Sequence, residues 1–208
     1  MPSAEHLEKD ADGALLSHRK IRRLSAENLR DAVLLTCGSL DQRLAGPSVP
    51  VHLTDQMTGR GRPNISGPLD GDHRRSIYLE VRRNFLNPFL IAFDFPMPSS
   101  TTGRRNDSNV PAQALGLLND PLMDLMSQRW AQQTDQWSSP HRRIELMFQT
   151  ALGRSPTDTD SLRCMEFVTS YSQDTNESSE PSKNSTDLTA WQDLAHLLLN
   201  AKEFWFLR

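Results

Sequence analysis

The stretch GPLDGDHRRSIYLEVRRNFLNPFLIAFDFPMPSSTTGRRNDSNVPAQALGLLNDP, residues 67–121, contains the features that decide the fold. Ile77, Leu79 and Val81 alternate with polar residues, a pattern typical of a half-buried strand, so we expect a strand at 75–83. Asn87 and Pro88 then precede an apolar run. Asn caps helices, and Pro fits the first turn because its missing N–H needs no partner there. The stretch therefore predicts a strand followed by short helices.

The same helix signal recurs downstream, where Pro111, Pro121 and Pro140 each precede an amphipathic run. Short helices joined by tight turns favour a compact helical layer over a long bundle. A lone strand cannot satisfy its backbone groups, so the strand at 75–83 needs a partner, and 49–53 is the candidate. We therefore predict a mainly α fold: a compact multi-helix domain of short Pro-initiated helices, with a minor two-stranded β element and long loops.

The remaining periodicity predicts further helices, at 25–37 with Ser25 as the cap, at 158–171 and at 188–204. Residues 46–71 hold four Pro and five Gly and are expected to form a long irregular segment. Trp130 and Trp191 lie on apolar helix faces and are expected in the core, whereas Trp137 and Trp205 are possible surface contacts.

We expect a disordered lead at 1–13 and a single mostly helical domain at 14–208, in which 172–187 form a flexible loop rich in Ser, Asn and Glu. The polar, acidic start is no secretory signal, and no apolar run is long enough to span a membrane. Cys37 and Cys164 make no zinc or haem motif. Two separate buried thiols are favoured over a disulfide between them.

Charge is distributed unevenly, with net −3 over residues 1–18, +6 over 19–105 and −6 over 106–208. The basic middle either faces the acidic tail or meets an anionic partner. Nucleic-acid binding is not favoured, because the basic run at 14–23 has no interleaved aromatic residues.

A knot of charged residues is the sharpest candidate site: Asp70, Asp72, His73, Arg74 and Arg75, with Arg104 and Arg105 on a later loop. The spacing matches no EF-hand, because position twelve from Asp70 is Val81, and His73 belongs to no zinc motif. We favour internal ion pairs in which these arginines hold the aspartates and fix the loop to the strand. The alternative is a polar cleft with free carboxylates that bind a metal ion or act on a polysaccharide.

Eight ordered phrases carry a family resemblance: RRLSAENLRDA (22–32), GPSVP (46–50), DGDHRRSIY (70–78), RRN (104–106), PAQAL (111–115), LNDP (118–121), ALGR (151–154) and LLNAKEF (198–204). Over about residues 14–207 the chain resembles the planctomycete-type PSD-one domain, or domain of unknown function 1553. The resemblance implies the C-terminal part of a large exported or periplasmic protein that often carries haem in a separate cytochrome c-like domain. It supplies no catalytic residues.

This chain departs from that pattern, since it has no haem motif or signal peptide and starts where the family domain is already under way. We therefore expect a truncated product, with no cofactor of its own. Its expected partner is the missing N-terminal part of the family domain or another protein. The sequence favours a non-catalytic structural or interaction domain; the alternative is a hydrolase-like or metal-binding domain using the charged knot.

Overall fold

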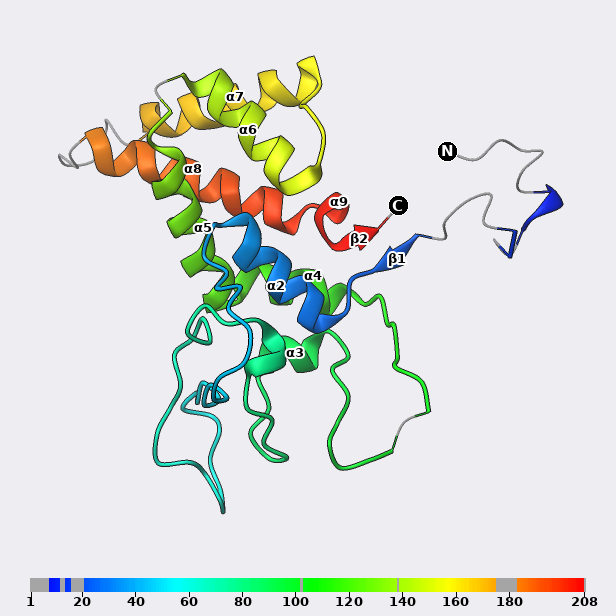
Figure 1. The fold of residues 1–208 in the computed structure, drawn as a ribbon. Coiled ribbons are helices and arrows are strands. Elements are labelled where there is room, and N and C mark those ends of the chain that lie inside the picture. The colour runs from blue at the N-terminus through cyan, green and yellow to red at the C-terminus, as the bar shows by residue number, and fades with distance from the viewer. Residues whose placement is uncertain are drawn as a thin grey trace.

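The computed structural model describes residues 8–11, 14–15, 21–101, 103–137, 139–174 and 183–207. Within them the chain forms eight α-helices, one 3-10 helix and one two-stranded antiparallel sheet (Figure 1). In chain order they are β1 (Arg22–Arg23), α2 (Ala26–Thr36), η1 (Ser76–Tyr78), α3 (Pro88–Ala92), α4 (Pro111–Asn119), α5 (Pro121–Thr134), α6 (Pro140–Leu152), α7 (Asp158–Asp174), α8 (Lys183–Asn200), α9 (Lys202–Trp205) and β2 (Phe206–Leu207). The predicted mainly α fold with a minor two-stranded β element is confirmed.

The predicted helix starts are confirmed at all four prolines, because α3, α4, α5 and α6 each begin with Pro at the first position. Asn87 Oδ1 accepts the Leu90 N–H of α3 at 3.3 Å, and Asp120 Oδ1 accepts the Leu122 N–H of α5 at 2.8 Å. Each side chain satisfies a backbone donor that the first helical turn leaves without a partner.

The helices pack around a central pair, α5 and α8. On one side α6 and α7 cover α8, and on the other α2 and α4 lie against α5, while α3 packs against α2 and α4 (Figure 1). Met123 and Met126 of α5 and Ala195 and Leu199 of α8 are completely buried. One continuous apolar core therefore joins the two sides of the domain.

The predictions for Trp130 and Trp191 are confirmed, and the prediction for Trp205 is wrong. Trp130 and Trp191 are buried, as predicted from their helix faces. Trp205 is only 3% exposed, so the expected surface contact is wrong. The chain turns back at Ala201, which places the Trp205 ring edge-on to Phe93, with 6.1 Å between ring centroids, and its indole N–H donates to the Asn200 carbonyl at 3.2 Å.

The strands are not where the alternating pattern placed them. The sheet pairs β1 with β2 at opposite ends of the described chain. Residues 75–83 were expected to form a strand, but they contain the 3-10 helix η1. Of the expected pairing with 49–53, the structure has a single parallel bridge between Val49 and Leu79. The physical reason is that a side chain of α2 binds the backbone here in place of a neighbouring strand. The Asp31 carboxylate accepts the Ser76 N–H at 2.7 Å.

Both ends of the stretch 172–187, which was expected to be a flexible loop, are helical. Helix α7 continues to Asp174 and α8 begins at Lys183, five residues before the predicted start, while residues 175–182 lie outside the described chain. Of the expected lead at 1–13, residues 1–7 and 12–13 also lie outside it.

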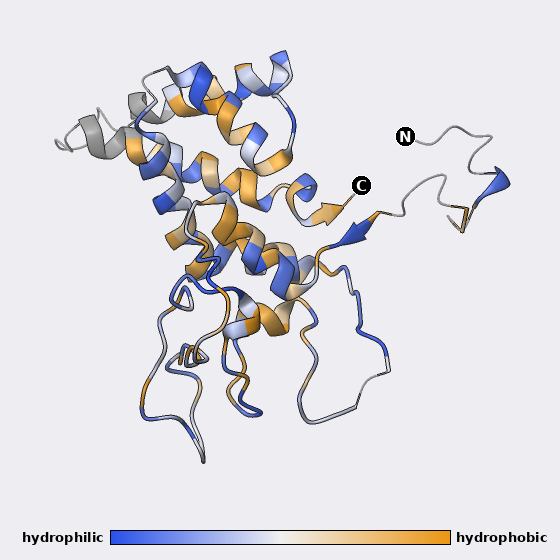
Figure 2. Ribbon diagram, in the orientation of Figure 1, coloured by the Kyte–Doolittle hydropathy of each residue, from blue (hydrophilic) through white to orange (hydrophobic). Residues whose placement is uncertain are grey.

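Long irregular loops connect α2 to α3 and α3 to α4, and they project from the helices on the α3 side (Figure 1). Hydrophobic segments occur on these loops as well as on the helices (Figure 2). In the part of the chain that the structure describes, every helix is too short or too polar to cross a bilayer.

Two glycines at helices should respond in opposite directions to alanine. Gly116 lies inside α4 with no atom within 4 Å of an added Cβ, so Gly116→Ala should raise the free energy of unfolding by about 0.5–1 kcal/mol through helix propensity. Gly153 ends α6 with φ of 66°, so Gly153→Ala should lower it by about 1 kcal/mol although the space is open. Urea titrations of both variants measure the free energy of unfolding. Changes of the same sign in the two variants would contradict the prediction.

Candidate functional site

Arg30 of α2 fixes the charged loop in place. Its side chain is completely buried, and its Nη1 donates to the Arg74 carbonyl at 3.0 Å and to Ser76 Oγ at 3.1 Å. Its Nη2 donates to the Asp70 carbonyl at 2.5 Å. Burial lowers the pKa of Arg30, and the neighbouring carboxylates of Asp31 and Asp70 oppose that shift. One guanidinium thus binds loop 70–76 to helix α2.

The carboxylate of Asp70 is buried and fully engaged. Its Oδ2 lies 2.8 Å from Arg129 Nη1 of α5 and 3.5 Å from His73 Nε2, and its Oδ1 accepts the Asp72 N–H at 3.1 Å. The ion-pair partner is Arg129, and none of the four arginines expected from the sequence contacts this carboxylate. Loop 70–76 is therefore bound to two helices, α2 and α5.

The other members of the knot lie in different surroundings. Arg74 is buried, stacks over the Tyr78 ring with its guanidinium 4.1 Å from the centroid, and donates to the Ala45 carbonyl at 2.5 Å. Arg75 is half exposed and lies 4.0 Å from the Asp31 carboxylate. Asp72 is exposed with φ of 55°.

Arg104 and Arg105 do not join this group. Arg105 pairs with the Glu27 carboxylate at 2.8 Å on the surface, and Arg104 is exposed on the same loop. The structure thus brings Asp70 together with His73 but places Arg104 and Arg105 apart. Sequence reasoning missed Arg30 and Arg129. For Arg30 a signal exists, since it falls on the buried stripe of α2 with Ala26, Val33 and Cys37.

The two aspartates of the knot give a matched test. Asp70→Asn removes the charge that pairs with Arg129 at a buried position, so we expect the free energy of unfolding to fall by about 1–3 kcal/mol. Asp72→Asn should leave it almost unchanged, because the side chain is exposed and Asn tolerates a positive φ. Urea unfolding of the two variants provides the measurement. A larger loss for Asp72→Asn would contradict the assignment.

A second buried arginine fixes the loop that follows α3. Arg23 donates to the Phe93 carbonyl at 3.3 Å and to the Ser108 carbonyl at 3.1 Å, and its Nη2 lies 2.7 Å from Asp94 Oδ2. Burial raises the pKa of Asp94, but hydrogen bonds from Ser108 and the charge of Arg23 together lower it below its ordinary value. The loop carrying Arg104 and Arg105 is therefore held at its two ends.

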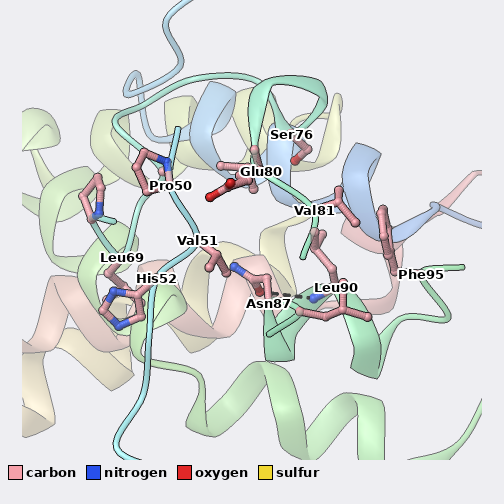
Figure 3. A pocket seen from close by; sticks show the side chains of 14 residues that line it. Pro50, Val51, His52, Leu69, Ser76, Glu80, Val81, Asn87, Leu90 and Phe95 are labelled. Carbon is pink, nitrogen blue, oxygen red and sulfur yellow. Dashed lines mark hydrogen bonds between the residues drawn. The ribbon is translucent and has the colours of Figure 1, made fainter. Parts of the chain in front are cut away.

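A small cavity lies beside the charged loop, between residues 50–52, 68–71, 76–81 and 86–95 (Figure 3). Its volume is about 20 Å³, which is room for a single water molecule. Val51, Leu69 and Leu90 give it a mostly apolar wall, and no member of the charged knot lines it. Among the described residues, no three His, Cys, Asp or Glu side chains gather closely enough to hold a metal ion.

Both cysteines are free thiols in the structure. Burial raises the pKa of Cys37 to about 12, and burial also raises the pKa of the half-buried Cys164. A thiol with a raised pKa is a poor nucleophile near neutral pH. Neither cysteine therefore has the environment of an activated catalytic thiol.

Comparison with known proteins gives one result. No curated protein matches the chain, and no solved structure matches it. The family model PSD1, described as protein of unknown function (DUF1553), matches residues 1–168, from the first residue to a point inside α7. That match covers most of the chain and includes loop 70–76 with both helices that hold it, so this chain belongs to the PSD1 (DUF1553) family.

Proposed function

We propose that this chain is a non-catalytic domain that binds another protein through the loops on its α3 side. The observation that carries the proposal is the exposure of large apolar side chains there. Leu44, Ile65 and Ile77 are 76%, 73% and 76% exposed, and Val81 is 49% exposed. We call these four residues the apolar loop face.

The four residues border one segment of backbone. The Ala45 N–H donates to the Tyr78 hydroxyl at 2.8 Å, which joins the backbone next to Leu44 to the side chain of the residue that follows Ile77. Ile65 lines a shallow depression together with Glu80 and Arg82, and both of these flank Val81. Single exposed apolar residues are ordinary, but a group gathered on one face is typical of a protein-binding surface.

The bonds within the charged knot support a non-catalytic role. Both oxygens of Asp70 are engaged, and Arg30 and Arg74 are buried and bonded to backbone carbonyls. A general acid or a metal ligand needs an oxygen that can reach a substrate or an ion. In this loop the charges instead hold the backbone that presents Ile77.

Arginines flank the apolar loop face, which favours a partner with acidic groups around an apolar centre. Arg43 precedes Leu44 and Arg75 lies two residues before Ile77, while Arg82 and Arg83 follow Val81. These arginines are exposed. Rim charges of this kind chiefly set the rate and the specificity of association.

Site-specific photo-crosslinking tests the proposal. A benzophenone amino acid at position 77 should give one defined protein adduct in the native cells. The matched control is position 162, because Leu162 on α7 is also exposed, at 60%, and lies away from the loops. The adduct protein, purified and mixed with this chain, should bind it, and Ile77→Asp should abolish that binding while Leu162→Asp leaves it intact.

Two results would overturn this function. The first is the same set of adducts from positions 77 and 162, which would mean that contacts are random. The second is saturable binding of calcium, or polysaccharide cleavage, that Asp70→Asn abolishes in a folded protein. That second result would favour the hydrolase-like or metal-binding alternative.

A further inference from the structure

A second, larger pocket opens next to the small cavity. Its volume is about 520 Å³, within the range of small-molecule sites. Four parts of the chain line it: loop 52–56, Leu69, the start of α3 and the junction between α4 and α5. His52, Leu69 and Asn87 line both hollows, so the pocket lies on the outer side of the packed loop that forms the small cavity.

The charged groups of this pocket are all carboxylates. Asp55 and Asp120 line it, and no Lys or Arg among the residues that the structure describes does. Asp120 caps α5 through the Leu122 N–H, so its position is set by the helix. Burial raises the pKa of Asp120, and the backbone hydrogen bonds of the cap oppose that shift.

The neutral polar groups add further acceptors. His52 Nδ1 lies 3.0 Å from the Gly67 carbonyl, which can only accept, so Nδ1 carries the proton. In the neutral ring Nε2 is then an acceptor. Asn119 uses its amide N–H on the Leu115 carbonyl at 2.9 Å, so its side-chain oxygen remains an acceptor. Leu69, Pro88 and Pro121 supply apolar walls between these groups.

We propose that this pocket binds a small organic cation, a primary ammonium group on an apolar body. The ammonium provides three donors and a positive charge to a site that offers acceptors and negative charge. The apolar body lies against the leucine and the two prolines. An anionic ligand is disfavoured, because it would meet the carboxylates of Asp55 and Asp120, and Asp120 already accepts the Leu122 N–H at the positive end of α5.

The test uses two ligands that differ in charge, benzylamine and benzyl alcohol, added to the full ¹⁵N-labelled chain. Benzylamine should give saturable shifts of the Asp55, Gln56 and Asn119 amides, and benzyl alcohol should bind at least about tenfold more weakly, as expected for a charge-assisted hydrogen bond. Asp120→Asn removes the charge but preserves the cap, because Asn is also a good cap. It should weaken benzylamine binding by about tenfold or more.

Asp55→Asn gives a second charge deletion on an exposed loop, away from any helix cap. The matched control is Asp107→Asn, which removes the same charge from an exposed position outside the pocket and should leave the dissociation constant unchanged. Equal binding of the amine and the alcohol would overturn the proposal, as would unchanged affinity in both pocket variants. Saturable shifts of the same amides with calcium chloride, and none with benzylamine, would replace the organic cation with a metal ion.

Discussion

Replacing Arg30 by methionine is expected to lower the free energy of unfolding by about 3–5 kcal/mol, because it removes a buried cation on which several groups depend. The Arg74 and Asp70 carbonyls and the Ser76 hydroxyl all accept from this guanidinium. Methionine has a similar length but no donor, so these groups would stay buried without a hydrogen bond. Urea unfolding followed by circular dichroism measures the loss.

Two further substitutions separate the hydrogen-bond geometry from the charge. Arg30→Lys keeps the charge but lacks the planar guanidinium that reaches several acceptors. Its free energy of unfolding should therefore lie between those of the wild type and Arg30→Met. Arg75→Met removes a half-exposed arginine 4.0 Å from Asp31 and should cost at most about 1 kcal/mol. A loss below about 1 kcal/mol for Arg30→Met would show that loop 70–76 does not depend on this side chain.

The sequence predicted the helices well because their signals are local. Asn87 and Pro88 lie next to the helix that they start, and so do Asp120 and Pro121. A cap and the first-turn proline act within four residues, so a single sequence contains all the information they need. The mainly α fold followed from these local signals.

The sheet could not be predicted because its pairing is not local. Arg22 pairs with Leu207, so the pairing joins residues 185 positions apart in the chain. The alternating residues near 77 gave a false strand signal. Ile77 is 76% exposed, and Asp31 takes the backbone N–H that a neighbouring strand would have used. Tertiary hydrogen bonds here override the local pattern.

The sequence named residues of the charged loop but not the residues that hold this loop. Asp70 lies on the expected loop, yet its ion-pair partner Arg129 follows 59 residues later on α5. Arg30 reaches the Asp70 carbonyl across 40 residues. Such partners depend on how α2 and α5 pack against each other, and that packing leaves no trace at the spacing of the charged loop itself. An arginine on an apolar stripe, as at Arg30, is the one local sign of a buried polar contact.

Gly67→Ala is expected to open the loop between residues 47 and 67, because a methyl group has no space there. An added Cβ would lie 1.8 Å from the Pro50 carbonyl oxygen, which belongs to the backbone and cannot rotate away. The clash is relieved only if the segments around Pro50 and residue 67 move apart. That separation breaks the 2.9 Å hydrogen bond from the Gly67 N–H to the Val51 carbonyl and the contact of His52 with the Gly67 carbonyl.

The free energy of opening this loop is expected to fall by about 3 kcal/mol, because of overpacking together with lost hydrogen bonds. It should appear as local opening, because the core around α5 and α8 does not include this loop. Limited trypsin digestion measures it, since Arg60 is an exposed cleavage site inside the loop, whereas Pro63 blocks cleavage after Arg62. The Gly67→Ala protein should be cut there at least about tenfold faster, in line with such a loss.

Gly103→Ala is the matched control, because no atom lies within 4 Å of its added Cβ and it should be cut at the wild-type rate. Gly67→Ala also tests whether this loop shapes the larger pocket, which it helps to line. If Gly67 holds His52 in place, Gly67→Ala should weaken benzylamine binding while α5 and its Asp120 cap stay folded. Wild-type trypsin resistance in Gly67→Ala would mean that the two segments do not approach as closely as the structure describes.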